Sequence, residues 1–152
     1  MNLSAADGST FTLRILGYQF PELDAEPYDS NWLNIKIHVR VPAGAWSATT
    51  ACLLTYEISE LADWLEAMQE GRPAEDFWDF TEPNLQFALV VAPGQQPRLR
   101  IAFALECRPP WARGWAFGTP VWAEFPLAEV DLRRAANALR SQLQTYPQRT
   151  VY

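Results

Sequence analysis

The sequence is short of the residues that most catalytic and metal sites need. It holds one histidine, His38, and two cysteines, Cys52 and Cys107. Two thiols and one imidazole cannot supply the four ligands of a standard structural zinc site. No serine stands in a G-x-S-x-G elbow, and no glycine-rich phosphate-binding motif is present, so no cofactor is expected. Carboxylates are abundant, so a small hydrolase that uses a carboxylate pair stays open as an alternative.

Long apolar runs are also absent. No run approaches the ~20 residues that span a bilayer, and residues 1–8 lack the basic and apolar regions of a signal peptide. We therefore expect a cytoplasmic protein that contacts no membrane. Thiols stay reduced in that compartment, so Cys52 and Cys107 are expected to be free.

Bases are scarce in the first half of the chain. Residues 1–82 hold fourteen acids and four bases, whereas residues 83–152 hold four acids and eight bases. With a net charge of −6, the chain is a poor candidate for binding nucleic acid. It is a better candidate for binding a basic protein, because complementary fields speed encounter.

The clearest structural signal is the alternation of apolar and polar residues from Leu33 to Val41. Every second residue is apolar, and the residues between them include Lys36, His38 and Arg40. A period of two over this length predicts a strand with one dry and one wet face. A slip of one residue would bury Lys36 and Arg40, so the register is strongly fixed. We expect the central strand of an antiparallel sheet here, with His38 as a tolerated polar residue on its wet face.

Shorter alternations predict further strands on both sides of this one. They cover about 10–15, 46–56, 75–80, 84–91, 97–106 and 120–126, with turns at 42–45 and 93–97 and a break at 17–21. Helical spacing predicts helices at about 57–70 and 128–146. The predicted fold class is α+β: a single domain over residues 1–152, with one antiparallel sheet of about six strands and two helices packed on it.

The first predicted helix carries a stripe of acids beside its apolar face. Acids that recur every three or four residues share one exposed stripe and repel one another. Those in the last turn also oppose the helix macrodipole. The fold gains nothing obvious from this stripe, so it indicates either a solvated helix face or a surface for a basic partner. The predicted contact residues are Glu60, Asp63, Glu66, Glu70, Asp76 and Asp79.

The loop at 108–115 is a second candidate surface. It is marked by proline and glycine and holds Trp111 and Trp115 together with Arg108 and Arg113. Arginine can stack on tryptophan and order such a loop. The loop therefore either folds back to cover the core or forms an exposed contact patch, and Trp111 and Trp115 join the predicted contact residues.

Five short motifs between about residues 11 and 90 resemble the WapI family of immunity proteins. The Asp-x-Asn-Trp-Leu stretch is the most specific of them. The motifs are Gly17-Tyr18-Gln19-Phe20-Pro21, Tyr28-Asp29-Ser30-Asn31-Trp32-Leu33, Leu53-Leu54-Thr55-Tyr56-Glu57-Ile58, Trp64-Leu65 and Glu82-Pro83-Asn84-Leu85.

The resemblance implies a function that composition alone does not. Members of such families protect a bacterium from the toxic C-terminal domain of a neighbour's or sibling's surface protein, and several of those toxins are nucleases. The resemblance thus implies a non-enzymatic, cytoplasmic protein that binds a cognate toxin domain, which the charge pattern predicts to be basic. A structural or adaptor domain without a toxin partner is the alternative of a different class. Neither interpretation sets an oligomeric state.

Overall fold

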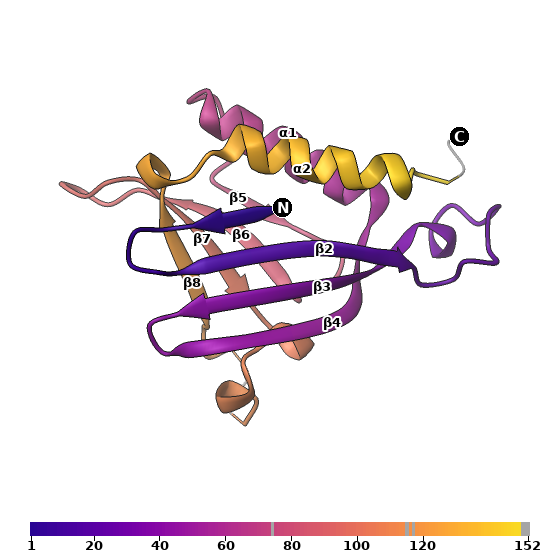
Figure 1. Cartoon of the computed structure of the whole chain (residues 1–152), viewed down its shortest axis with the longest axis horizontal. Coiled ribbons are helices and arrows are strands. Elements are labelled where there is room, and N and C mark those ends of the chain that lie inside the picture. Colours follow the sequence, from indigo (N-terminus) through magenta and orange to yellow (C-terminus); the bar gives the residue numbers. More distant parts are fainter. Residues whose placement is uncertain (74, 115, 117, 150–152) are drawn as a thin grey trace.

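The chain folds into two four-stranded antiparallel sheets and two helices, seen in a computed structural model that describes residues 1–73, 75–114, 116 and 118–149 (Figure 1). Sheet A has the strand order β1-β2-β3-β4, and sheet B has the order β5-β6-β7-β8. Helix α1 (Thr55–Gln69) connects the two sheets, and α2 (Leu132–Thr145) follows the last strand. The strands are β1 (Asn2–Ser4), β2 (Thr10–Tyr18), β3 (Trp32–Val41), β4 (Gly44–Leu54), β5 (Phe77–Asp79), β6 (Leu85–Val90), β7 (Arg98–Phe103) and β8 (Trp122–Pro126).

The inner faces of the two sheets share one apolar core. Phe11 of β2 lies 6.0 Å from Phe87 of β6 and 6.1 Å from Phe103 of β7, measured between ring centroids. Trp46 of β4 lies 5.1 Å from Phe103 in an edge-to-face contact. The same core takes in the apolar faces of both helices. The elements therefore form a single compact domain.

The prediction of one sheet of about six strands is wrong. Each predicted strand exists, but together with β1 they divide into two sheets of four. Alternation shows which residues of a strand face a core, and both sheets face the same one, so it could not separate them. The three-residue strand β1 was not predicted.

Strand β3 is the central strand that the alternation predicted, within sheet A. It pairs antiparallel with β2 and β4, and its residues Leu33, Ile35, Ile37 and Val39 are buried. Its turn into β4 is tight, since Val41 pairs with Gly44. The neighbouring strand β2 runs on to Tyr18 through a register shift between Ile15 and Gly17, where a break was predicted.

Both predicted helices are confirmed with shifted ends. Helix α1 begins at Thr55, where the Glu57 carboxylate accepts hydrogen bonds from the backbone N–H of Leu54 (2.8 Å) and of Thr81 (2.6 Å). The second of these bonds ties the helix start to the turn before β6. Helix α2 begins later than predicted, because residues 127–129 form a 3-10 turn and Asp131 caps the helix through the Arg134 N–H (2.9 Å).

Helix α2 closes the open edge of β2, beyond the short β1. The Gln142 side chain accepts a hydrogen bond from the Ile15 N–H (2.7 Å) and donates one to the Leu13 carbonyl (3.3 Å). The Tyr146 hydroxyl donates to the Leu16 carbonyl (3.2 Å). An uncovered strand edge is a template for unwanted pairing, and these side chains cover it. They also fix α2 beside sheet A, with α1 packed against α2 (Figure 1).

Both thiols are free and buried, as predicted. A hydrogen bond with the Cys107 thiol, together with burial, raises the pKa of the Cys52 thiol. A thiol with a raised pKa is not an activated nucleophile.

None of the helices in the described part of the chain has the length and apolar character needed to cross a membrane.

Candidate partner-binding surfaces

The predicted acidic stripe lies on α1, where it meets a row of arginines from α2. Asp63 and Glu66 each place a carboxylate oxygen 2.7 Å from the Arg140 guanidinium. Glu70 lies 2.9 Å from Arg133, which also approaches Glu66 at 3.9 Å. The hydrogen bonds that the Arg140 guanidinium donates to Asp63 and Glu66 raise the pKa of Arg140. The expectation that the fold gains nothing obvious from the stripe is therefore wrong, because three of its acids form ion pairs with α2.

Glu60 differs from the other acids of the stripe. It is exposed and forms no ion pair with any described cation. Partial desolvation, followed by the nearby charges of Glu57 and Asp63, raises the pKa of its carboxyl. Asp63 keeps 70% of its side-chain surface exposed despite its bond to Arg140. The part of the stripe that still offers negative charge to a partner is thus its N-terminal half.

Asp76 and Asp79 lie beyond α1, at the edge of sheet B. Both are exposed, and Asp79 belongs to the edge strand β5. The Asp79 carboxylate accepts a hydrogen bond from the Gln86 amide (2.6 Å). Their charge therefore lies on a different element from the stripe on α1.

Trp111 packs against the core on one side and is exposed on the other. Its ring packs edge-to-face on Trp46, with centroids 5.5 Å apart, and keeps 42% of its surface exposed. A Cβ added at Gly44 would lie 2.8 Å from the Trp111 ring, so the tight turn before β4 makes room for this contact. Trp115 lies outside the described residues.

The structure does not gather the predicted contact residues on one surface. In Figure 1 the two helices lie above the sheets, whereas the orange segment near residue 110 lies below them. The acids of α1 and Trp111 are therefore on opposite sides of the molecule. Nothing in the described geometry tests which of them meets a partner, so both sets stay predictions.

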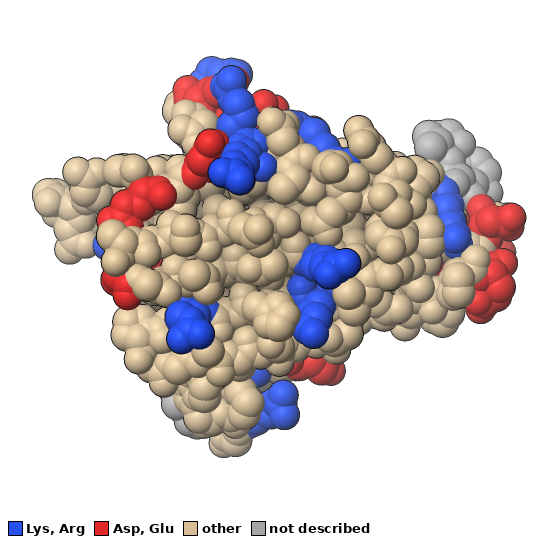
Figure 2. All heavy atoms as spheres, in the orientation of Figure 1, with Lys and Arg blue, Asp and Glu red and all other residues tan. Residues whose placement is uncertain are grey.

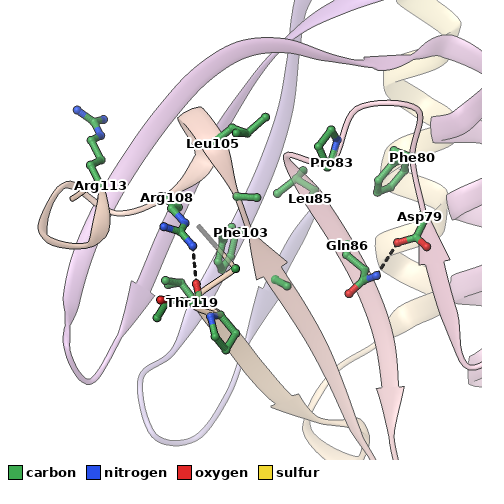
Figure 3. Close-up of a pocket in the computed structure, with 15 residues that line it drawn as sticks. Asp79, Phe80, Pro83, Leu85, Gln86, Phe103, Leu105, Arg108, Arg113 and Thr119 are labelled. Atoms are coloured by element: carbon green, nitrogen blue, oxygen red, sulfur yellow. Dashed lines mark hydrogen bonds between the residues drawn. The ribbon is translucent and has the colours of Figure 1, made fainter. Parts of the chain in front are cut away.

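A cavity of about 710 Å³ opens at one end of sheet B (Figure 3). Its walls are largely apolar and include Phe80, Leu85 and Leu105. The Arg108 guanidinium is occupied by the carbonyl oxygens of Ala112 (3.4 Å) and Thr119. Asp79 is the one carboxylate among the described residues that line this cavity. A glycosidase-type mechanism needs two, so the cavity lends no support to the hydrolase alternative.

His38 meets a serine on the outer face of sheet A. Its Nδ1 lies 2.6 Å from the Ser47 Oγ, and the two residues are exposed cross-strand neighbours. A Ser–His nucleophile needs a third group that orients the imidazole, and the strands of sheet A contain no Asp or Glu. We therefore interpret the contact as a cross-strand polar pair. Within the described ranges, no three His, Cys, Asp or Glu side chains could hold a metal ion.

Asn31 of the Asp-x-Asn-Trp-Leu motif forms a buried hydrogen-bond network that connects distant segments of the chain. Asn31 is fully buried, and its amide donates to the carbonyl oxygens of Pro27 and Arg149, both at 2.8 Å. Its carbonyl accepts from the Thr55 hydroxyl and from the Arg149 N–H, also at 2.8 Å. One side chain thus joins the loop before β3, the start of α1 and the C-terminal segment. Because buried polar groups are costly to leave unpaired, this network explains the motif without a partner.

Sequence reasoning missed two features of these surfaces. The pairing of α1 acids with Arg133 and Arg140 joins residues about seventy positions apart, which no local pattern reveals. The second feature is the outer face of sheet A, which collects Arg14, Lys36 and Arg40. Its signal was present in the strand alternation, which already placed Lys36 and Arg40 on one face.

Comparison with known proteins adds one finding to this geometry. The model of the family described as "Immunity protein WapI-like family" matches residues 2–147. The match runs well past the 11–90 stretch that carries the motifs and takes in both sheets and both helices. No curated protein matches the chain.

Proposed function

This chain belongs to the immunity protein WapI-like family, and we propose that it binds a cognate toxin domain and neutralises it by covering its working surface. The observation that carries the proposal is the family match over nearly the whole chain. Neutralisation by binding needs no catalytic group and no cofactor, so the chain acts as a non-enzymatic inhibitor. Its place of action is the cytoplasm, where an incoming toxin would meet it.

The proposed toxin is basic, and a nuclease is the favoured class. A nuclease needs a positively charged cleft for its phosphate-rich substrate, and an acidic surface complements such a cleft. On this chain the acids that still offer charge are Glu60 and Asp63 on α1, with Asp76 and Asp79 beyond it. Charge complementarity of this kind mainly raises the association rate and the specificity.

Aromatic anchors contribute most of the affinity in many interfaces. Trp111 keeps part of its ring exposed next to Trp46, and Trp115 follows it in the sequence. Because Trp111 lies across the molecule from α1 (Figure 1), it forms a second proposed contact rather than an extension of the first, and Trp115 is proposed with it on the sequence alone. Glu66 and Glu70 are proposed contacts whose charge is already shared with α2.

The proposal predicts that the gene directly upstream encodes a large secreted or surface toxin, and the test is co-expression of this chain with the C-terminal domain of that upstream product. We expect the chain to restore growth of cells that express the toxin domain, and to co-purify with it. An inactive variant of the toxin should co-purify equally, because binding does not depend on the toxin's activity. A domain without a toxin partner would neither protect nor co-purify, and that result would overturn the proposal.

A further inference from the structure

The outer face of sheet A carries positive charge with nothing to neutralise it. Strands β1 to β4 contain three bases, Arg14, Lys36 and Arg40, and no acid. All three bases point to the outer face, since the residues between them are buried. None forms an ion pair with a described acid. This is an unusual surface for a chain whose net charge is −6.

The strand register places two of these charges against each other. Arg14 of β2 lies directly opposite Lys36 of β3. Like charges in directly opposed positions destabilise a sheet. In sheet B the bases are paired. Glu124 on β8 lies 3.1 Å from Arg98 and 2.6 Å from Arg100 of the neighbouring strand β7. The fold therefore pairs both bases of sheet B with an acid and leaves the three bases of sheet A unpaired with any described acid.

The same face is not covered by either helix (Figure 1). Figure 2 looks onto it and shows Lys and Arg side chains over its middle, with acidic side chains only towards the edges of the view. Both helices lie along the β1–β2 side and leave this face uncovered (Figure 1). Short polar residues surround the bases: Thr49 pairs with Lys36, and Ser47 pairs with His38. Such a surface lets a partner approach the charges without displacing side chains.

We propose that the outer face of sheet A, through Arg14, Lys36 and Arg40, binds an acidic surface of the toxin domain. This proposal rests on the proposed function, because it assigns a second contact to the same partner. Helix α2 lies between α1 and sheet A (Figure 1), so it separates the acidic surface of α1 from the basic face of sheet A, and a toxin domain that covers both would span α2. A partner that carries both signs of charge would be bound in a single orientation, which is how interface charges set specificity.

A protein partner fits this face better than a nucleic acid does. Nucleic-acid binding is carried largely by contacts of bases with phosphates, about six to ten of them in a strongly salt-dependent complex, and this face offers three bases. The acidic remainder of the chain would also repel a polyanion. Carboxylates of a folded partner can instead be placed individually opposite each base.

Lys36 allows a direct chemical test, because it is the only lysine in the sequence. A carbodiimide reagent joins an amine to a carboxylate that it touches, with no spacer. In the complex of the full chain with the toxin domain, we expect a cross-link between Lys36 and an Asp or Glu of the toxin, identified by mass spectrometry. The variant K36R keeps the charge and the binding but should lose this cross-link.

Association kinetics give the second measurement. The variant R14E/K36E should slow association with the toxin domain at least about tenfold at low salt. The single variants K36E and R134E make equal changes in net charge, and only K36E, which lies on sheet A, should slow association, because Arg134 is exposed on α2 and forms no ion pair with a described acid. Circular dichroism confirms that each variant is folded before the rates are compared.

The outcomes separate this inference from the proposed function. If the unmodified chain does not bind the toxin domain, the proposed function fails. If it binds, but Lys36 forms no cross-link and R14E/K36E associates at the unmodified rate, this inference alone is overturned. It is also overturned if R14E/K36E loses binding to a single-stranded oligonucleotide while toxin binding is unchanged, since the face would then serve nucleic acid.

Discussion

The surface formed by α1 and α2, here called the helical face, and the outer face of sheet A differ in how far their charges are paired. On the helical face, acids of α1 meet Arg133 and Arg140 of α2, so much of the charge is cancelled inside the fold. On sheet A, Arg14 and Lys36 stand opposite each other with no acid in any strand of the sheet. The more charged face is thus the better neutralised one.

This contrast shows that the number of charged residues in a stretch of sequence does not predict how much unpaired charge its surface carries. The region Glu57–Glu82 is the most acidic stretch of the sequence, yet three of its acids are committed to arginines of α2. The three bases of sheet A are few but uncompensated. A partner responds to the charge that remains after the fold has formed its own pairs.

The largest expected effect comes from breaking the sheet that holds the bases. Ile37 is fully buried beneath Lys36 and His38. We predict that Ile37→Ala lowers the free energy of unfolding by roughly 2–5 kcal/mol, the range for truncating a buried large aliphatic residue. Denaturant melts measure this loss. A loss below about 1 kcal/mol would show that β3 does not form the centre of sheet A.

Reversing the acidic stripe tests the helical face as a partner surface. We predict that E60K/D63K/E66K slows association with a basic toxin domain at least about tenfold at low salt. Because Asp63 and Glu66 bind Arg140, the triple variant should also lose about 1 kcal/mol of stability. Stopped-flow rates over a salt series, with melts of each variant, measure both effects.

A single variant separates the two effects of that triple change. Glu60 forms no ion pair with a described cation, so E60K reverses one charge without breaking a pair. It should slow association and leave the melting midpoint nearly unchanged. Unchanged rates in E60K and in the folded triple variant would remove α1 from the interface. The loop that holds Trp111 and the outer face of sheet A would then be the remaining candidates.

Removing an arginine from α2 should leave the acids of α1 that it pairs with unpaired and so increase the negative charge of the helical face. We predict that Arg140→Met costs about 0.5–1 kcal/mol, because the pairs with Asp63 and Glu66 are partly exposed. The same variant should speed association with a basic toxin domain. Arg134→Met is the matched control, since Arg134 is exposed on α2 and forms no ion pair with a described acid. If both variants melt alike, the α1–α2 pairs contribute nothing to stability.

The smallest expected effect concerns the pH dependence at Glu60. Desolvation raises the pKa of this carboxyl in the folded chain, so the folded state favours its protonated form. Ionisation of Glu60 therefore opposes folding at pH values above the raised pKa, and this penalty disappears below the unfolded pKa. We predict that Glu60→Gln melts slightly higher than the unmodified chain at pH 7 and identically at pH 3.5. Thermal melts at the two pH values check this, and an equal difference at both would contradict it.

Local structure could be predicted from the sequence because its causes are local. The alternation through Ile37 predicted β3 and its buried face, and helical spacing predicted α1 and α2. The turn predicted at 93–97 connects β6 to β7, which pair antiparallel. The division into two sheets could not be predicted in this way, because strands of either sheet bury the same alternate residues against one core.

The candidate site was less predictable, because its charges depend on contacts between distant segments. The partnership of Asp63 with Arg140 joins two helices and reverses the interpretation of the stripe as costly. The role of Asn31 likewise could not be predicted from the sequence. Its motif indicated a family, but only the fold shows that its amide is occupied by Pro27, Thr55 and Arg149.

The most direct test of the account is a stoichiometric titration of the toxin. A fixed amount of the toxin domain is mixed with increasing amounts of the purified chain, and the remaining toxin activity is measured. Neutralisation by binding predicts a linear fall to zero at a fixed molar ratio, with a complex of that ratio in native mass spectrometry. Toxin activity that persists in excess chain, or that disappears with trace amounts of it, would contradict the account.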